Sequence, residues 1–387
     1  MNFNLNSEQQ MLQDSVRRFV ARDYSFEARN AALAAGLACS ESHWRAFADN
    51  GWLAAALPEA YGGSDGTVIE TVLIAQEFGR ALVVEPYMGC AVLGAQTIVA
   101  AGTHAQREHL LPLVADGTRK VALAHGEGQA SGNVASVEAR AERSGEGYRL
   151  FGNKTLVPGG AEAHTFIVSA VTPDADGLTL FVVDANMPGL QRHVLPLHDG
   201  SRAAELTLDG VAVTRAAVLG EHGQGLPAVQ HALAHGTATL CAELVGGMEQ
   251  AIAMTADYFK VRKQFGVPLG SFQALQHRLA DMAAELEVAR SMLYALLASI
   301  ANDTAEQCDY VVSQTASLTS AAAKYVCGQA IQLHGGIGMT EEYQVGHYYK
   351  RATVAEALLG GGDTHDARCA QYLQRTLVHG DTRNDRV

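Results

Sequence analysis

The spacing of apolar residues divides the chain into three successive regions. Up to about residue 120 they return every three or four positions, which is the spacing of amphipathic helices. The pattern then changes to short β-rich runs bounded by Gly, Pro and Asp. Beyond about residue 225 the helical period returns in much longer segments. We therefore expect an N-terminal all-α domain over 1–120, a middle β domain over 121–225 and a C-terminal helical bundle over 226–387.

The first helix is expected to begin close to Ser7. Met11, Val16 and Phe19 follow on one face at helical spacing. Serine is a preferred N-cap residue, and Gln10 three positions later completes the pattern of a capping box. These features predict that Ser7 caps the helix.

The two later domains differ in what separates their apolar runs. No helical segment separates the runs of the middle domain, which favours an antiparallel barrel or sandwich over parallel βαβ units. In the last domain, Ala-rich amphipathic segments at 227–266, 271–301 and 314–336 predict long helices. Helices of this length with apolar stripes are typical of a four-helix bundle.

Composition excludes several classes of protein. The 387 residues are 48% hydrophobic and 18% charged, which is typical of a globular chain with more than one domain. The net charge of −13 argues against a nucleic-acid binder, because a phosphate backbone would repel it. No CxxC pair occurs among the six cysteines, so neither a metal site nor a disulfide framework is indicated.

The sequence carries no sign of a membrane or export segment. Its N-terminus, MNFNLNSEQQ, is polar and lacks the basic and apolar regions of a signal peptide. No uninterrupted apolar run reaches the ~18 residues that a spanning helix needs. We therefore expect a cytoplasmic protein without integral membrane association.

Two long segments match known motifs nearly letter for letter. They are YFKVRKQFGVPLGSFQALQHRLADM at 258–282 and QLHGGIGMTEEYQVGHYYKRA at 332–352, with shorter similarities at 58–63 and 107–117. Together with the domain order, they make the chain resemble the acyl-CoA dehydrogenase family over nearly its whole length. The resemblance implies FAD as cofactor, an acyl-CoA thioester as substrate, α,β-desaturation as reaction and electron-transfer flavoprotein as acceptor.

The resemblance also implies which residues hold FAD. Arg262 would offer a charged planar donor to the pyrophosphate, and Gly335 and Gly336 would let the backbone approach phosphate oxygens without a Cβ in the way. Phe265 would pack on the adenine side. In the family these groups reach across a dimer interface into the neighbour's cofactor, which implies a tetramer built as a dimer of dimers. The expected cofactor-binding residues are Arg262, Gln264, Phe265, Gln273, Gln332, Leu333, Gly335 and Gly336.

The middle domain departs from the family pattern where the chain would hold a flavin ring itself. Gly126 stands where the family has a threonine that touches the ring. Leu156 replaces the aromatic residue that would cover it. Pro158 replaces a second threonine, so the hydroxyl and the backbone N–H are both missing. These losses all concern the flavin that this chain would bind on its own.

Both positions that carry the catalytic base in the family are empty here. The resemblance puts the usual glutamate at Leu359, 27 positions after Gln332. It puts the alternative glutamate at Gly236, on the long helix. Neither leucine nor glycine has a side-chain group that accepts a proton. No catalytic residue is therefore secure.

Nearby residues offer replacements for the missing base. Asp363 lies four positions beyond Leu359, about one helical turn away, and Glu356 lies three before it. His235 flanks the alternative position. However, the segment GDTH fits the beginning of a last helix better, with Asp363 as its N-cap or first-turn residue. A relocated base at Asp363 stays an alternative.

These features leave several functions open. The combination resembles the base-deficient subunit of heteromeric acyl-CoA dehydrogenases of bacterial steroid and dicarboxylate degradation, including small subunits of the pimeloyl-CoA type. A second hypothesis is a self-sufficient homotetramer with a relocated base. A third is a non-catalytic acyl-CoA or flavin-binding protein, and a fourth is another flavin chemistry such as a monooxygenase. The sequence does not fix the acyl chain.

Overall fold

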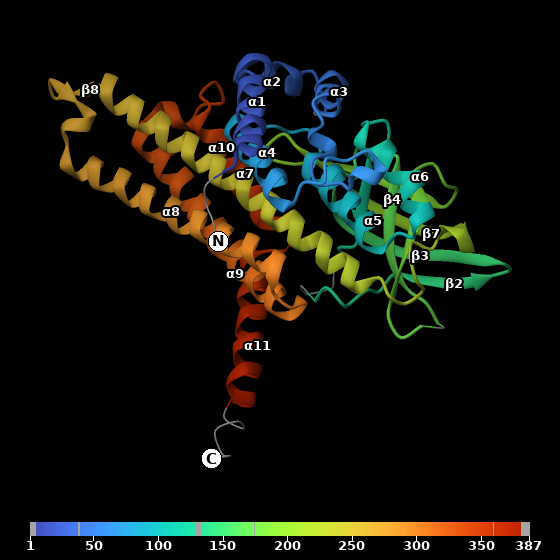
Figure 1. The fold of residues 1–387 in the computed structure, drawn as a ribbon. Coiled ribbons are helices and arrows are strands. Elements are labelled where there is room, and N and C mark those ends of the chain that lie inside the picture. Colours follow the sequence, from blue (N-terminus) through green and yellow to red (C-terminus); the bar gives the residue numbers. More distant parts are fainter. Residues whose placement is uncertain (1–4, 38, 129–132, 174, 359, 381–387) are drawn as a thin grey trace. The chain divides into compact units, whose positions relative to one another are not determined.

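The chain forms two compact units, Met1–Gly247 and Met248–Val387, and the boundary between them falls inside the long helix α7 (Leu226–Val261). Figure 1 traces the elements of both units in the computed structural model. The residues that the structure describes are 5–37, 39–128, 133–173, 175–358 and 360–380.

The first unit opens with helices, as the apolar period predicts. An aromatic cluster forms much of their core: the Phe47 ring stacks on Phe78 with centroids 4.7 Å apart, and Trp52 meets Phe78 edge-on at 6.0 Å. A π-helix and two 3₁₀ turns interrupt the α-helices. In chain order the elements are α1 (Ser7–Asp23), α2 (Phe26–Ala34), α3 (Glu41–Asp49), η1 (Trp52–Ala54), η2 (Glu59–Tyr61), α4 (Val68–Ala81), the π-helix η3 (Tyr87–Gly94), α5 (Ala95–Ala101) and α6 (His104–Ala115).

The cap of α1 differs from the prediction by one residue. Asn6, and not Ser7, is the N-cap, and its Oδ1 accepts a hydrogen bond from the Gln9 N–H at 2.8 Å. Gln9 Oε1 in turn accepts from the Asn6 N–H at 3.1 Å, which completes a capping box. Asparagine caps helices as well as serine does, so a run of two polar residues leaves the register of the cap undecided in the sequence.

The middle of the first unit is a seven-stranded sheet. The strands are β1 (Val121–Ala124), β2 (Arg140–Ser144), β3 (Gly147–Pro158), β4 (Thr165–Val171), β5 (Leu178–Asp184), β6 (Leu190–Pro196) and β7 (Arg202–Thr214), followed by the 3₁₀ turn η4 (Arg215–Ala217). They pair in the order β1-β4-β2-β3-β7-β6, and β5 pairs with β4. Buried Ala, Val, Leu and Phe side chains on these strands form the core of this domain.

Most strand pairs in this sheet are antiparallel, as predicted, but β1 is an exception. It pairs with β4 in parallel, with Val121 opposite Thr165, and a single parallel bridge joins Arg140 to Val171. Parallel neighbours need a long connection, which the β2–β3 hairpin supplies here in place of a helix. The absence of a helix between two strands therefore did not exclude a parallel pairing in this sheet.

The second unit consists of the end of α7 and four further α-helices. Helices α8, α10 and α11 all pack against α9, as the chain trace in Figure 1 shows. Among the described residues, the helices lack the length and apolarity that a membrane span requires. The elements after α7 are β8 (Lys263–Gln264), β9 (Val267–Pro268), η5 (Leu269–Ser271), α8 (Gln273–Asn302), α9 (Ala305–His334), η6 (Gly335–Met339), α10 (Val345–Ala357) and α11 (Gly362–Gly380).

Candidate cofactor site and the positions of the base

The motif around Arg262 forms a short hairpin at the end of α7. The helix ends at Val261, whereas the apolar pattern predicted that it continues to residue 266. The strands β8 and β9 pair antiparallel instead. The Leu269 N–H donates to the Arg262 carbonyl at 2.8 Å and closes the base of the hairpin. The helical period alone could not reveal this turn, because its residues do not break the apolar pattern.

The tip of the hairpin holds a phenylalanine in a strained backbone conformation. Phe265 and Gly266 have φ angles of +52° and +84°. Two central residues with positive φ make a type I′ turn, whose twist matches that of the paired strands. Glycine adopts this conformation freely, whereas a bulky residue does so at a cost of about 1–2 kcal/mol. The turn therefore keeps a phenyl group at a position where asparagine is the favoured residue.

The Phe265 side chain is also almost fully exposed. It keeps 92% of its surface accessible, and its ring meets Phe272 edge-on with centroids 6.2 Å apart. Strained backbone and an exposed aromatic ring both cost free energy in this unit. Strain that folding does not require is typically stored where a residue is presented to a ligand or partner.

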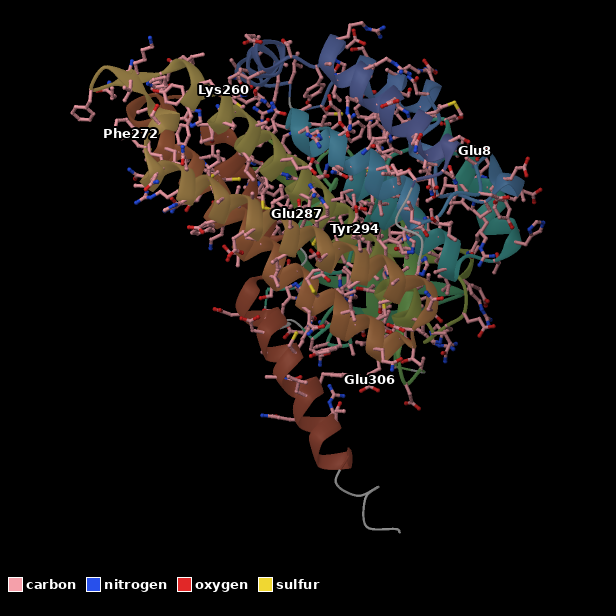
Figure 2. The ribbon with its side chains drawn as sticks, turned by 60° about the vertical axis from the view of Figure 1, so that its left-hand side comes forward. Glu8, Lys260, Phe272, Glu287, Tyr294 and Glu306 are labelled. Carbon is pink, nitrogen blue, oxygen red and sulfur yellow. The ribbon has the colours of Figure 1, made fainter. Side chains whose placement is uncertain are left out.

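The polar residues of the same motif are accessible to a ligand as well. Arg262, Gln264 and Gln273 are all exposed. Within the described part of the chain, the Arg262 guanidinium has no carboxylate or hydrogen-bonding partner, while its backbone N–H donates to the Tyr258 carbonyl at 2.9 Å. Figure 2 shows Lys260 and Phe272, which flank the hairpin, at one tip of the long helices. The hairpin thus presents an always-charged donor that is available to an anion.

The second motif lies at the C-terminal end of α9. Gly335 caps this helix with a φ of +66°, and its N–H donates to the Gln332 and Ile331 carbonyls. A Cβ at Gly335 or Gly336 would meet no atom of the chain within 4 Å. Capping explains the glycine at 335, but the packing of this chain does not require one at 336. Leu333 is buried, so its main chain, and not its side chain, is available to a ligand.

These two motifs fit part of an FAD molecule. An unpaired guanidinium suits the pyrophosphate, an exposed phenyl ring suits the adenine, and bare glycine backbone permits close approach of phosphate oxygens. The predicted residues other than Leu333 are exposed on these two segments, Arg262 to Gln273 and Gln332 to Gly336. Their roles toward FAD remain predictions.

The positions where the chain would hold a flavin ring itself do not fit that group. Leu156 lies at a bulge of β3 with a φ of +48°, and Pro158 ends the strand opposite Ala203. Behind it, Gly89 of η3 lies so close that a Cβ there would come within 2.5 Å of the Pro158 carbonyl. The Gly126 carbonyl accepts a hydrogen bond from the Thr155 N–H at 2.8 Å. These positions therefore provide no side-chain hydroxyl and, at Pro158, no N–H for a flavin.

A buried ion pair lies next to these positions. Lys154 Nζ donates to Glu127 Oε1 at 2.5 Å and to Ser169 Oγ at 3.0 Å, and the two charged side chains are 0% and 4% exposed. Burial lowers the pKa of Lys154 to about 8 against the opposing effect of Glu127. Burial alone would raise the pKa of Glu127, but Lys154 and the N–H groups of Glu138 and Ala139 hold it below its usual value. Glu127 thus anchors its loop and does not act as a free base.

Neither family position of the base supplies a proton acceptor here. Gly236 lies buried inside α7, and Leu359 lies outside the described residues. Asp363 lies in the first turn of α11, as predicted, and its side chain is exposed.

The other two replacement candidates are engaged or disfavoured. Lys324 Nζ donates to both carboxylate oxygens of Glu356 at 2.9 Å, which ties that side chain to α9. His235 is buried, and burial together with the neighbouring His231 lowers its pKa to about 3. A carboxylate held by a lysine and an imidazole of such low basicity are both poorly suited to remove a carbon-bound proton.

The sequence did not indicate that the histidine of the GDTH segment is buried. His365 is 2% exposed, and burial lowers its pKa to about 4. Gly360 has a φ of +112°, and a Cβ there would lie 3.3 Å from His365 Nε2. The glycine therefore leaves room for the imidazole, and a histidine following a run of glycines was the available signal. Within the described residues, no cluster of metal-ligating side chains occurs.

An apolar pocket of about 820 Å³ lies beside the hairpin, between the end of α7 and the beginning of α8. Its walls carry mainly aliphatic atoms, so it suits apolar side chains better than a charged ligand. The residues that line it include Ile252, Ala256, Phe259, Pro268, Leu279 and Ala283.

The chain is similar to known proteins over nearly its whole length. The acyl-CoA dehydrogenase N-terminal, middle and C-terminal domains match residues 6–118, 122–211 and 223–373. Probable acyl-CoA dehydrogenase YngJ of Bacillus subtilis (strain 168) is 32% identical over 92% of this chain and 95% of its own length.

Two solved structures whose names each join two proteins are also similar to this chain. The ChsE4-ChsE5 complex from Mycobacterium tuberculosis has a TM-score of 0.88 and 28% identity over 97% of this chain and 99% of its own. A variant of the Tcur3481-Tcur3483 steroid ACAD has a TM-score of 0.85 and 31% identity, over 96% and 99%. The domain matches, the relatives and the order of helices, sheet and helices agree, and the chain belongs to the acyl-CoA dehydrogenase family of FAD-dependent oxidoreductases that act on CH–CH bonds.

Proposed function

We propose that the chain is the base-deficient subunit of a heteromeric acyl-CoA dehydrogenase and completes the FAD site of a related partner chain. One contrast carries this proposal. The two loops that the family extends toward a neighbour's FAD present an exposed guanidinium, an exposed phenyl ring and exposed glycine backbone, whereas the positions that would serve the chain's own flavin and base offer no suitable groups.

In this role each exposed residue has a physical task. The Arg262 guanidinium neutralises pyrophosphate charge, Gly335 and Gly336 admit the phosphate oxygens, and Phe265 covers the adenine. Bound FAD supplies the acceptor for the hydride that leaves the acyl β-carbon. The partner chain supplies the carboxylate that removes the α-proton, since both base positions of this chain lack an acceptor.

Two further observations support association with a related chain. The apolar pocket beside the hairpin and the exposed Phe265 ring are surfaces that a subunit interface would cover. Two of the similar solved structures carry names that join two proteins, ChsE4-ChsE5 and Tcur3481-Tcur3483. We extend the proposal to an α2β2 tetramer in the cytoplasm that acts on an acyl-CoA and passes electrons to an electron-transfer flavoprotein.

A self-sufficient homotetramer with Asp363 as base is the alternative. Asp363 is exposed in the first turn of α11, where a carboxylate is a favoured helix-start residue without any catalytic role. The alternative also requires the chain to bind its own flavin ring beside Pro158, where the N–H and hydroxyl donors are missing. In the heteromeric assembly the partner chain supplies both the base and the contacts to the flavin ring, so neither problem arises.

The test is to express the chain alone and together with a neighbouring gene product of the same family. Bound FAD per chain and reduction of an electron acceptor with several acyl-CoAs are then measured. We expect about one FAD per pair of unequal chains, turnover in the pair alone, and loss of FAD with Arg262→Ala. Full FAD loading and turnover by the lone chain would overturn the proposal, and loss of that turnover with Asp363→Asn would establish the alternative.

A further inference from the structure

We propose that His334 is a positioning residue that fixes the two cofactor-facing loops relative to each other. The inference rests on the proposed function in one respect, namely that these loops face FAD. The loops themselves are far apart in sequence, at Arg262–Gly270 and Gly335–Met339. Their relative placement therefore depends on side-chain contacts within the second unit.

The His334 ring contacts two tyrosine rings that come from different elements. It stacks on Tyr258 of α7 with centroids 4.6 Å apart and planes 30° apart. It meets Tyr343, in the segment between η6 and α10, with centroids 5.1 Å apart. In this three-ring stack His334 is 4% exposed, whereas Tyr258 and Tyr343 are partly exposed, and the plane of Tyr343 is tilted by 51° from the imidazole. Aromatic ring pairs in contact stabilise one another beyond the effect of their burial.

Each side of this stack is joined directly to one cofactor-facing loop. The Tyr258 carbonyl accepts the Arg262 N–H at 2.9 Å, so the ring sits one helical turn before the guanidinium. His334 is bonded to Gly335, the residue that caps α9 and turns the chain with its positive φ. A shift of the His334 ring therefore moves the hairpin and the glycine loop apart.

A hydrogen bond fixes the orientation of the imidazole in the stack. His334 Nδ1–H donates to the Ala330 carbonyl at 2.7 Å, one turn back along α9. This bond fixes the orientation of the ring on its own helix, and both tyrosines contact the ring in that orientation. A flat ring that also donates a hydrogen bond suits this position better than an aliphatic side chain, which would fill the space without defining a plane.

The chain offers a matched control at the opposite end of α9. Tyr310, near the start of that helix, stacks on Tyr372 of α11 with centroids 4.2 Å apart and planes 16° apart. Glu306 marks this end in Figure 2, and Tyr310 lies 24 residues before His334 along α9, so about 36 Å separates the two stacks. Tyr372→Ala thus removes a comparable ring contact without touching the loops.

The first measurement is hydrogen exchange in the full chain without cofactor. We expect His334→Ala to raise amide exchange at least tenfold at Arg262 and Leu269, whose N–H groups donate to the Tyr258 and Arg262 carbonyls at the base of the hairpin. His334→Phe, which keeps a flat ring, should stay within about threefold of the parent chain. Tyr372→Ala should change exchange in α11 and leave the hairpin amides as they are. Unchanged hairpin exchange in His334→Ala would overturn the proposal.

The second measurement is the FAD dissociation constant of the assembly that binds FAD, with Arg262→Ala as the reference for the loop. We expect His334→Ala to weaken FAD binding about tenfold, while Tyr372→Ala with a similar loss of thermal stability does not. If Arg262→Ala weakens binding and His334→Ala does not, positioning by His334 is wrong. If neither does, the proposed cofactor surface is wrong, and the exchange experiment still decides whether His334 couples the loops.

Discussion

Both carboxylate oxygens of Glu356 lie 2.9 Å from Nζ of Lys324, and this pair ties the end of α10 to the middle of α9. The two side chains keep 35% and 38% of their surfaces exposed, so solvent screens much of their attraction. We predict that Glu356→Gln lowers the free energy of unfolding by about 0.5 kcal/mol and leaves turnover of the active assembly within twofold. Urea denaturation and steady-state rates check this. A fall in turnover of 100-fold or more without a change in acyl-CoA affinity would instead make Glu356 the relocated base.

Relieving the strain at the tip of the hairpin should stabilise the chain and weaken its binding of FAD. Phe265→Asn creates Asn-Gly, the favoured sequence of a type I′ turn, and relieves a positive φ that phenylalanine adopts poorly. The isolated chain should gain about 1 kcal/mol in its free energy of unfolding, while the assembly should bind FAD several-fold more weakly. Denaturant titration and FAD titration test the two halves. A stabilised chain with unchanged FAD affinity would show that the exposed ring does not meet the cofactor.

The buried Lys154–Glu127 pair predicts an unusual dependence on pH. Lys154→Met leaves the Glu127 carboxylate buried without its cation, and we expect a loss of about 3–5 kcal/mol at pH 7. In the parent chain the pKa of Glu127 lies below its usual value, so its contribution is lost as pH falls below about 4.3. In the variant, burial should raise that pKa, so the unfolded state binds fewer protons and stability is regained as pH falls from 7 toward 5.

Chemical denaturation of the parent chain and Lys154→Met at pH 7 and pH 5 checks this reversal. The double variant Lys154→Met, Glu127→Gln is the control, because it carries no buried charge at either pH. At pH 7 we expect the free energy of unfolding of the double variant to be closer to that of the parent chain than that of the single variant is. A single variant that is equally destabilised at both pH values would contradict the prediction.

His365 predicts a loss of stability in mild acid. Its folded-state pKa is about 4, below the ordinary value of 6.5, because burial disfavours the charged imidazole. Between these values the unfolded chain binds more protons, so the free energy of unfolding falls as pH drops from 6.5 toward 4, by up to about 3 kcal/mol. His365→Leu should flatten this slope, as measured by denaturant titration at pH 7, 5.5 and 4.5. An unaltered slope in the variant would assign the acid sensitivity to other groups.

The sequence predicted the domain order and the first-turn position of Asp363, because apolar periodicity and helix-start chemistry are local. It missed the hairpin after Val261, because the turn depends on two positive φ angles that no periodicity reports. It missed His365 and the three-ring stack on His334, because both depend on contacts between segments that are distant in the chain. The empty base positions were found by comparing motifs, since a missing side chain leaves no local pattern.

The exposed hairpin also affects how the chain behaves before it meets any partner. A free copy displays the Phe265 ring with 92% of its surface in water, next to an unpaired arginine and an apolar pocket. Such a surface invites non-specific association and recognition by chaperones and proteases. We therefore expect the lifetime of this chain in a cell to depend on the supply of its partner, so that unmatched synthesis of the two subunits leads to its removal.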